Sequence, residues 1–246
     1  MPIVDYLTLI RGLPYCVNGI KIYPPLLDEI AEITYQTYES YLSIFFLSAV
    51  EIGRLIGLQD GALPPTMTSI QLITYIPELR AALMQALSFF AHAEISYSEE
   101  FGYFTKMDDG IHYISLDDIR NMRSVILQFC NIHDDAEVAP VKFKNAKAKE
   151  IYEKIQRKKA EKQRMASSSK DLLSMTLPNL ISAVAAFSTT YNYLNIWQLT
   201  VFQFYDEFAR LSDKIQLDVH GQRWAAWGTE DFDFSVWYRL LNSKNP

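Results

Sequence analysis

Apolar residues recur at a spacing of three to four positions across residues 26–56, which is the pattern of an amphipathic helix. A Pro-Pro pair at 24–25 precedes this stretch, and a proline at a helix start is pre-organised for helical geometry. Two short β-prone runs flank Asn18-Gly19 just before the prolines. Because Asn-Gly supplies the two positive φ angles of a type I′ turn, residues 13–23 are predicted to form a β-hairpin.

The middle of the chain is predicted to contain more helix and a second hairpin. Pro77 must divide the helical stretch 69–93, because proline lacks an N–H and clashes with the preceding turn. Two β-prone runs about a central turn predict a hairpin within residues 101–115. Ser115 and Asp118 have the spacing of a capping box, so a further helix should begin there.

Two helices are predicted near the C-terminus. Thr176 is the expected N-cap of the first, and Thr200 and Gln203 have the spacing of a capping box for the second. Consecutive helical positions lie 100° apart, so Tyr205 falls at the edge of an apolar face. We expect this face to be core, and it consists of Phe204, Phe208 and Leu211.

Charge divides the chain into three parts. Eleven of the 23 Lys and Arg residues lie in residues 141–170 with only three acids, a net charge of +8 in a protein of net charge −6. Residues 1–140 carry −11 and residues 171–246 carry −3. We therefore predict a mainly α protein with one or two small β-hairpins: an acidic N-terminal body (1–140), a basic helical connector (141–170) and an aromatic-rich helical C-terminal body (171–246).

The sequence contains no recognisable catalytic or metal-binding pattern. Its four histidines lack the His-x-x-x-His spacing, and Cys16 and Cys130 lack the short spacing of zinc ligands. Glycine-rich phosphate-binding loops are also absent. We therefore expect neither an enzyme nor a cofactor nor a metal ion. Two reduced thiols are favoured over a disulfide, because disulfide-stapled chains are usually small and cysteine-dense.

The apolar stretches are too short to predict a membrane protein. The longest, residues 41–50, compares with the roughly 20 residues needed to span a bilayer. Residues 1–13 lack the basic region that precedes the apolar core of a secretion signal. We therefore expect a cytoplasmic protein.

Protein–protein contact is the function class that these features favour. Large aromatic side chains in the C-terminal part serve either as core or as interface anchors, and the candidates for partner binding are Trp197, Tyr205, Trp224 and Trp227. The basic tract is a spacer, a protein-binding segment or a site for nucleic-acid phosphates. Protein contact or a spacer role is favoured because few aromatic residues for base stacking accompany its candidate residues, Lys154, Arg157, Lys158, Lys159 and Lys162.

Several segments resemble tail-morphogenesis proteins of tailed bacteriophages that infect Gram-positive bacteria. The resembling segments are GIKIYPPLLDEIAEITYQTYESYLS (19–43), NAKAKEIYEKIQRKKAE (145–161), NIWQLTVFQFYDEFARL (195–211) and WAAWG (224–228). The resemblance implies a role like that of tail assembly chaperones, whose partners are tape-measure and tail-tube proteins in the host cytoplasm.

Two alternatives to a free assembly chaperone remain open at this point. One is a structural component of the virion tail or baseplate, and the other is a modulator of host nucleic-acid machinery that acts through the basic tract. Self-association into a homo-oligomer is compatible with each of these roles.

Overall fold

The computed structural model describes residues 2–57, 64, 67–108, 110–132 and 176–228. The chain divides into two compact units. Unit 1 comprises Met1–His133 and Trp197–Glu207, and unit 2 comprises Asp134–Ile196 and Phe208–Pro246. Residues 197–207 of the C-terminal body expected from the sequence therefore group with the N-terminal unit, and the expected boundaries at 140 and 170 lie outside the described residues.

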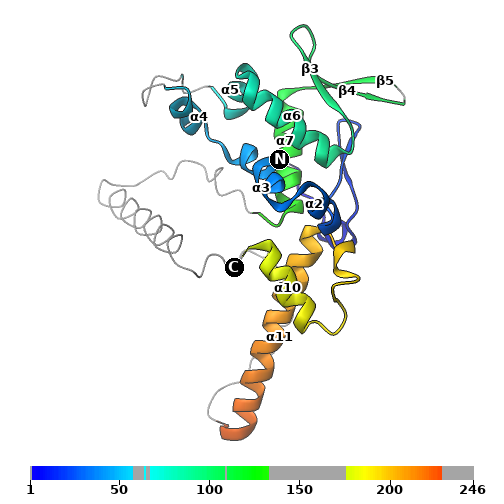
Figure 1. Ribbon diagram of the computed structural model, residues 1–246, viewed down its shortest axis with the longest axis vertical. Helices are drawn as coiled ribbons and strands as arrows, with labels where there is room; N and C mark the ends of the chain where they lie inside the picture. Colours follow the sequence, from blue (N-terminus) through cyan, green and yellow to red (C-terminus); the bar gives the residue numbers. More distant parts are fainter. Residues whose placement is uncertain (1, 58–63, 65–66, 109, 133–175, 229–246) are drawn as a thin grey trace. The chain divides into compact units, whose positions relative to one another are not determined.

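The protein is mainly α with two small antiparallel sheets, as predicted (Figure 1). The helices of the N-terminal part are α1 (Tyr6–Arg11), α2 (Leu27–Ile33), α3 (Tyr35–Phe46), α4 (Ala49–Leu55), α5 (Ser69–Tyr75), α6 (Pro77–Ala91) and α7 (Leu116–Phe129). The C-terminal part holds α10 (Leu177–Phe187), the short 3₁₀ helix η2 (Ile196–Gln198) and α11 (Val201–Trp227). The strands are β1 (Tyr15–Val17), β2 (Ile20–Ile22), β3 (Ile95–Ser98), β4 (Gly102–Met107) and β5 (Gly110–Ile114).

The Asn-Gly hairpin is confirmed. Asn18 and Gly19 have φ angles of 48° and 82°, and β1 pairs with β2 in an antiparallel register across them. Ile20 and Ile22 are fully buried, so one side of the hairpin faces the core of unit 1. The amide of Asn18 donates to Asp118 Oδ2 at 3.1 Å, which fixes the hairpin tip against the start of α7.

The apolar stretch 26–56 forms three helices rather than one. Thr34, with a φ of 76°, ends α2 and caps α3, and its hydroxyl accepts the N–H of Thr37 at 3.4 Å. Ser48 forms a capping box with Glu51 at the start of α4, with N–H···O distances of 3.2 and 2.9 Å. The backbone groups freed at each break therefore find side-chain partners.

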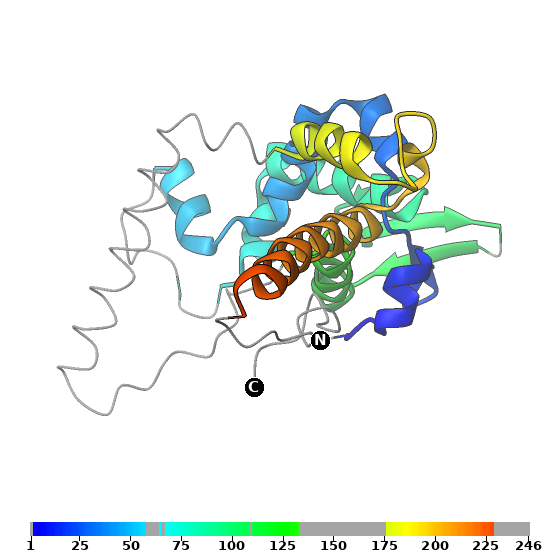
Figure 2. The same ribbon diagram turned by 90° about the horizontal axis from the view of Figure 1, so that it is seen from below.

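Pro77 separates α5 from α6, and Ser115 forms its capping box with Asp118, as predicted. The predicted second hairpin is β4–β5. It belongs to a three-stranded sheet of order β3-β4-β5, because residues 95–98 form an additional strand. Figure 2 shows these strands extending away from α7.

The core of unit 1 lies among its helices and the inner side of this sheet. Helix α6 packs along α3 and α5, and its Phe90 is buried beside Phe45 with ring centroids 6.1 Å apart. Tyr103 of β4 is also buried, and its hydroxyl lies 3.1 Å from Thr74 Oγ1 at the end of α5. The sheet is thereby joined to the helices by packing and by a hydrogen bond.

A short antiparallel pairing joins residues 25–27 to residues 199–201. The N–H of Leu27 donates to the Leu199 carbonyl and the N–H of Val201 donates to the Pro25 carbonyl, both at 2.9 Å. The paired residues between them, Leu26 and Thr200, are the residues that precede α2 and α11. We call this pairing the clasp, and it places the first turns of α11 in unit 1.

Gly12 packs closely against the clasp. It ends α1 with a φ of 65°, and a Cβ at this position would lie 2.9 Å from Cγ2 of Thr200. Thr200 is buried and its hydroxyl accepts the N–H of Gln203, so it cannot rotate away without losing this bond. Gly57 also has a left-handed φ, of 78°, but nothing lies within 4 Å of its Cβ position.

Substitution of these two glycines measures how tightly Gly12 packs against Thr200 of the clasp, with Gly57 as the control. Gly57→Ala should lower the free energy of unfolding by about 1–2 kcal/mol, the cost of placing a Cβ in left-handed geometry. Gly12→Ala should cost about 1–3 kcal/mol more, as in other overpacked sites. Urea denaturation of both variants measures the difference. Equal destabilisation by the two would show that the contact with Thr200 is not tight.

Candidate partner-binding surface

Helix α11 carries three of the four aromatic residues predicted to bind partners, and its start is fixed by local and distant contacts. Thr200 forms the predicted capping box: its N–H donates to Gln203 Oε1 at 2.9 Å, and its hydroxyl accepts the N–H of Gln203 at 3.2 Å. The same Gln203 side chain donates to the Ile10 carbonyl at 2.6 Å. Tyr6 donates to Asp206 at 3.0 Å. The first turns of α11 are therefore held rigidly in unit 1.

An apolar stripe runs along α11 and becomes more exposed towards its C-terminal end. At 100° per residue its members fall within about 80° of one another on the helix surface. Phe204 is fully buried, Phe208 and Leu211 are half-buried, and Ile215 and Val219 are exposed, the last at 51%. The predicted face thus exists, but Phe204 rather than Phe208 is its buried member. The core contact of the stripe ends well before the helix does.

The last two turns of α11 expose Trp224 and Trp227, the latter at 69%. By helical geometry Trp224 lies about 180° from Ile215, so these tryptophans occupy a different side of the helix from the stripe. The helix ends at Gly228, whose φ is 58° and whose N–H donates to the Trp224 carbonyl at 2.8 Å. This half of α11 therefore presents large apolar side chains on two sides, which is unusual for a helix that lies in water.

Other described residues of unit 2 are also apolar and exposed. Phe187 at the end of α10 and Tyr193 and Leu194 in the following loop are all exposed. Side-chain hydrogen bonds stabilise the loop: Asn195 donates to the Thr190 carbonyl at 3.0 Å and accepts the N–H of Asn192 at 2.8 Å. The exposed large hydrophobic side chains described for unit 2 are Phe187, Tyr193, Leu194, Ile215, Val219, Trp224 and Trp227.

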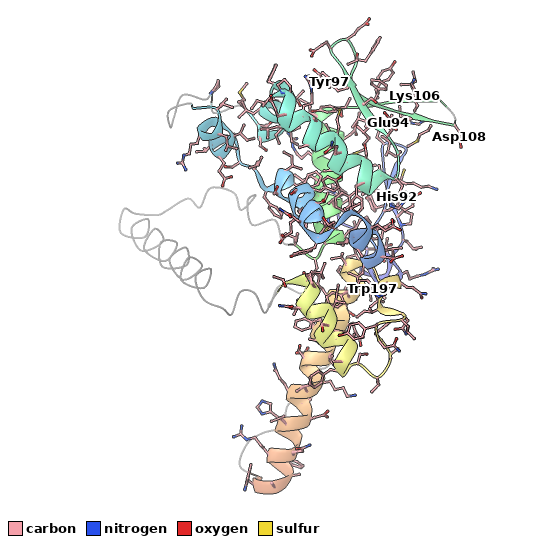
Figure 3. The ribbon with its side chains drawn as sticks, in the orientation of Figure 1. His92, Glu94, Tyr97, Lys106, Asp108 and Trp197 are labelled. Atoms are coloured by element: carbon pink, nitrogen blue, oxygen red, sulfur yellow. The ribbon has the colours of Figure 1, made fainter. Side chains whose placement is uncertain are left out.

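Trp197 and Tyr205, the other two predicted aromatic residues, lie in unit 1 and are half-buried. Trp197 belongs to η2, which leads into α11 (Figure 3). Tyr205 lies at the edge of the apolar face, as predicted, and this edge is turned towards Cys130. Burial and the neighbouring Cys130 thiol raise the pKa of Tyr205. Both residues thus have much of their rings inside unit 1, unlike Trp224 and Trp227.

Cys130 is the centre of a small buried polar cluster. Tyr38 donates a hydrogen bond to its Sγ at 3.2 Å. Burial raises the pKa of Cys130 to about 12, although the bond from Tyr38 opposes the shift. Burial and the same thiol raise the pKa of Tyr38 as well. A thiol that keeps its proton at neutral pH is a poor nucleophile, so its hydrogen bond and its packing are what it contributes here.

The five predicted basic residues lie outside the described residues: Lys154, Arg157, Lys158, Lys159 and Lys162. Within the described ranges, no group of three or more His, Cys, Asp or Glu side chains could hold a metal ion. His92 instead lies at the end of α6, 3.1 Å from Glu29 and stacked on Tyr23 (Figure 3). No described helix is both long enough and apolar enough to span a membrane.

Comparison with protein families found a match to the C-terminal part of the chain. Residues 162–242 match the family model described as YomV second domain. The family is phage-derived, of the Bacillus phage SPBc2 type. The matched segment covers about a third of the chain and includes α10 and the whole of α11. Comparisons with curated proteins and with solved structures gave no match.

Sequence reasoning did not identify a second exposed apolar surface, on the three-stranded sheet. Its residues are Phe101, Ile111 and Tyr113, all more than half exposed. The alternation of Gly110 to Ile114 indicates a strand with one buried side. Which side faces water depends on the packing of α7 and β1–β2, so the alternation alone could not assign it.

The two phenylalanines of the stripe allow a test of where the core ends. Phe204→Ala should lower the free energy of unfolding by about 3–5 kcal/mol, because the side chain is fully buried. Phe208→Ala removes the same atoms from a half-buried site and should cost less than half as much. Urea denaturation checks both, and an equal loss in the two variants would show that the stripe is buried beyond Phe204.

The Cys130 cluster predicts a loss of stability at alkaline pH. The unfolded thiol releases its proton near pH 9, whereas the folded thiol holds it to about pH 12. Above pH 9 the unfolded state therefore binds fewer protons, and stability falls by up to about 1.4 kcal/mol per pH unit. Between pH 9 and 10, Cys130→Ala should reduce this fall and the exposed-site control Cys16→Ala should not, while the tyrosines contribute to the fall in both variants. Urea denaturation at each pH gives the slopes, and an unchanged slope in Cys130→Ala would contradict this assignment.

Proposed function

We propose that this protein assists phage tail assembly through protein–protein contacts, as a chaperone that holds apolar segments of tape-measure or tail-tube proteins. The observation that carries the proposal is the exposed apolar surface of α11. This surface lies inside the segment that matches a phage-derived family. The expected setting is the host cytoplasm, where tail proteins are made and assembled.

The geometry of α11 suits a helical client. An amphipathic client helix binds by inserting side chains at helical spacing against an apolar groove or face. The stripe side of α11 offers Ile215 and Val219, one turn apart, and the opposite side offers Trp224. Two apolar sides allow one helix to contact two client segments, or one segment that wraps around it.

Tryptophans are suited to provide most of the binding energy in such a contact. Trp and Tyr are enriched among the few interface residues whose truncation costs more than about 2 kcal/mol. Trp224 and Trp227 lie in the last two turns of a continuous helix, so their backbone is already ordered before binding. The proposal includes no catalytic step, because holding a client requires none.

Substitution of both tryptophans tests the proposal. The protein should co-purify with the tape-measure or tail-tube protein of its own phage when the two are co-expressed. Trp224→Ala combined with Trp227→Ala should weaken this binding at least about tenfold, because anchor residues of an interface are lost. The thermal midpoint should change little, since both rings are exposed.

Tyr75→Ala is the control, because Tyr75 is an aromatic residue of unit 1 that is 74% exposed. It should leave client binding unchanged. Failure of the wild-type protein to bind either client would contradict the chaperone role. Peptides of this protein in purified virions, at a fixed ratio to the tail proteins, would identify it as a structural tail component instead.

A further inference from the structure

The outer side of the three-stranded sheet carries an apolar surface in unit 1, separate from α11. Ile111 and Tyr113 of β5 are each 52% exposed, and the ring of Phe101 lies 5.8 Å from that of Tyr113. The β4–β5 hairpin projects from the rest of its unit in both views (Figures 1 and 2), with Asp108 at its tip in Figure 3. The surface is therefore open to a large partner.

The backbone of β5 is also available for pairing. In the order β3-β4-β5, strand β5 is at the edge of the described sheet. Residues of an edge strand alternate between bonding inwards to the neighbouring strand and directing their N–H and C=O groups outwards. The Tyr113 carbonyl accepts the Asn18 amide at 3.5 Å, from outside the sheet. Tyr113 is therefore an outward residue, and so is Ile111, two positions earlier.

Proteins usually block such an edge with lysine, proline or a bulge that prevents another strand from adding to it. The strand itself, Gly-Ile-His-Tyr-Ile, contains no lysine and no proline, and its pairing with β4 is regular over five consecutive residues. The same two residues, Ile111 and Tyr113, offer both outward backbone groups and exposed side chains. Edge and apolar surface together form a docking site for a β-strand.

We propose that the strand which docks there is β5 of a second copy of this chain, antiparallel and related by a two-fold axis through His112. In this register Ile111 lies opposite Tyr113 of the partner subunit, and Tyr113 lies opposite Ile111 of the partner subunit. Both pairs join an outward residue to an outward residue, so four backbone hydrogen bonds form. Each also places a β-branched side chain beside an aromatic ring, which is a favourable cross-strand pair.

Self-complementarity is the reason for choosing a second copy over an unrelated peptide. A two-fold interface requires one surface patch to match itself, and β5 meets this requirement in both its hydrogen bonds and its side chains. The Asn18 amide leaves a second lone pair free on the Tyr113 carbonyl, because a carbonyl oxygen accepts two hydrogen bonds. The resulting sheet would have six strands.

The size of the contact predicts a weak dimer. Each aromatic side chain carries about 150–250 Å² of surface, so the half-exposed rings and Ile111 contribute roughly 300 Å² per copy. With the strand backbone, both copies together reach about 1,000 Å², at the lower limit for specific interfaces. Dimerisation should therefore depend on concentration over about 1–100 μM.

Cross-linking at the axis is the sharpest test of the register. Residues that face each other in a non-hydrogen-bonded pair have Cα atoms about 4.5 Å apart, within the range of a disulfide. In a Cys16→Ser background, His112→Cys should give a disulfide-linked dimer on mild oxidation. Lys106→Cys, on β4 beside Ile111, is the matched control and should not cross-link, because β4 lies one strand further from the axis.

Sedimentation of the uncross-linked protein completes the test. The wild-type chain should shift from monomer to dimer as its concentration rises, and Ile111→Lys should keep it monomeric by placing a charge at the edge. Ile3→Lys replaces a residue that is 86% exposed elsewhere in unit 1 and should leave the dimer intact. A wild-type chain that stays monomeric up to 100 μM, or a dimer that Ile111→Lys does not affect, would overturn the proposal. So would a strand of another protein that occupies β5 while the chain itself remains monomeric.

Discussion

The arrangement of unit 1 depends on the clasp, where two helix starts that are about 170 residues apart pair as a short β-bridge. Each helix start leaves N–H groups without partners inside the helix. Here Leu27 and Val201 donate across the clasp, while the N–H groups of Leu26 and Thr200 donate to the side chains of Glu29 and Gln203. The carboxylate of Glu29 also offsets the positive ends of the two adjacent helix dipoles. Four backbone donors at this junction thus have acceptors, which makes the junction specific as well as stable.

Features of the fold that arise from neighbouring residues could be predicted from the sequence. Asn18-Gly19, Pro77 and the caps at Ser115 and Thr200 each act within four residues, and the structure has all of them. The break at Thr34 was not predictable in the same way. A threonine with a φ of 76° is strained, so its conformation is determined by the packing of α2 and α3 around it.

The candidate site likewise combines features that the sequence predicts with features that tertiary packing determines. Helical geometry placed Tyr205 correctly at the edge of the apolar face, but its neighbour there is Cys130, from a distant part of the sequence. The exposed fraction of Tyr205, which limits its contact with a partner, is therefore determined by tertiary packing. Trp224 and Trp227 follow Gly221 in the last two turns of α11, and their side chains are 52% and 69% exposed. Unit 1 thus uses the first turns of α11 for its stability, whereas the later turns belong to unit 2.

The division of the chain between the units has a consequence for how the protein can be handled. Unit 1 is built from two stretches of sequence, because residues 197–207 complete a core that residues 1–133 begin. A chain cut between residues 134 and 175 would therefore leave two fragments that each hold one side of the clasp. The two pieces should recombine when mixed, as in fragment complementation, and α11 can serve as a removable probe that reports whether the N-terminal fragment has folded.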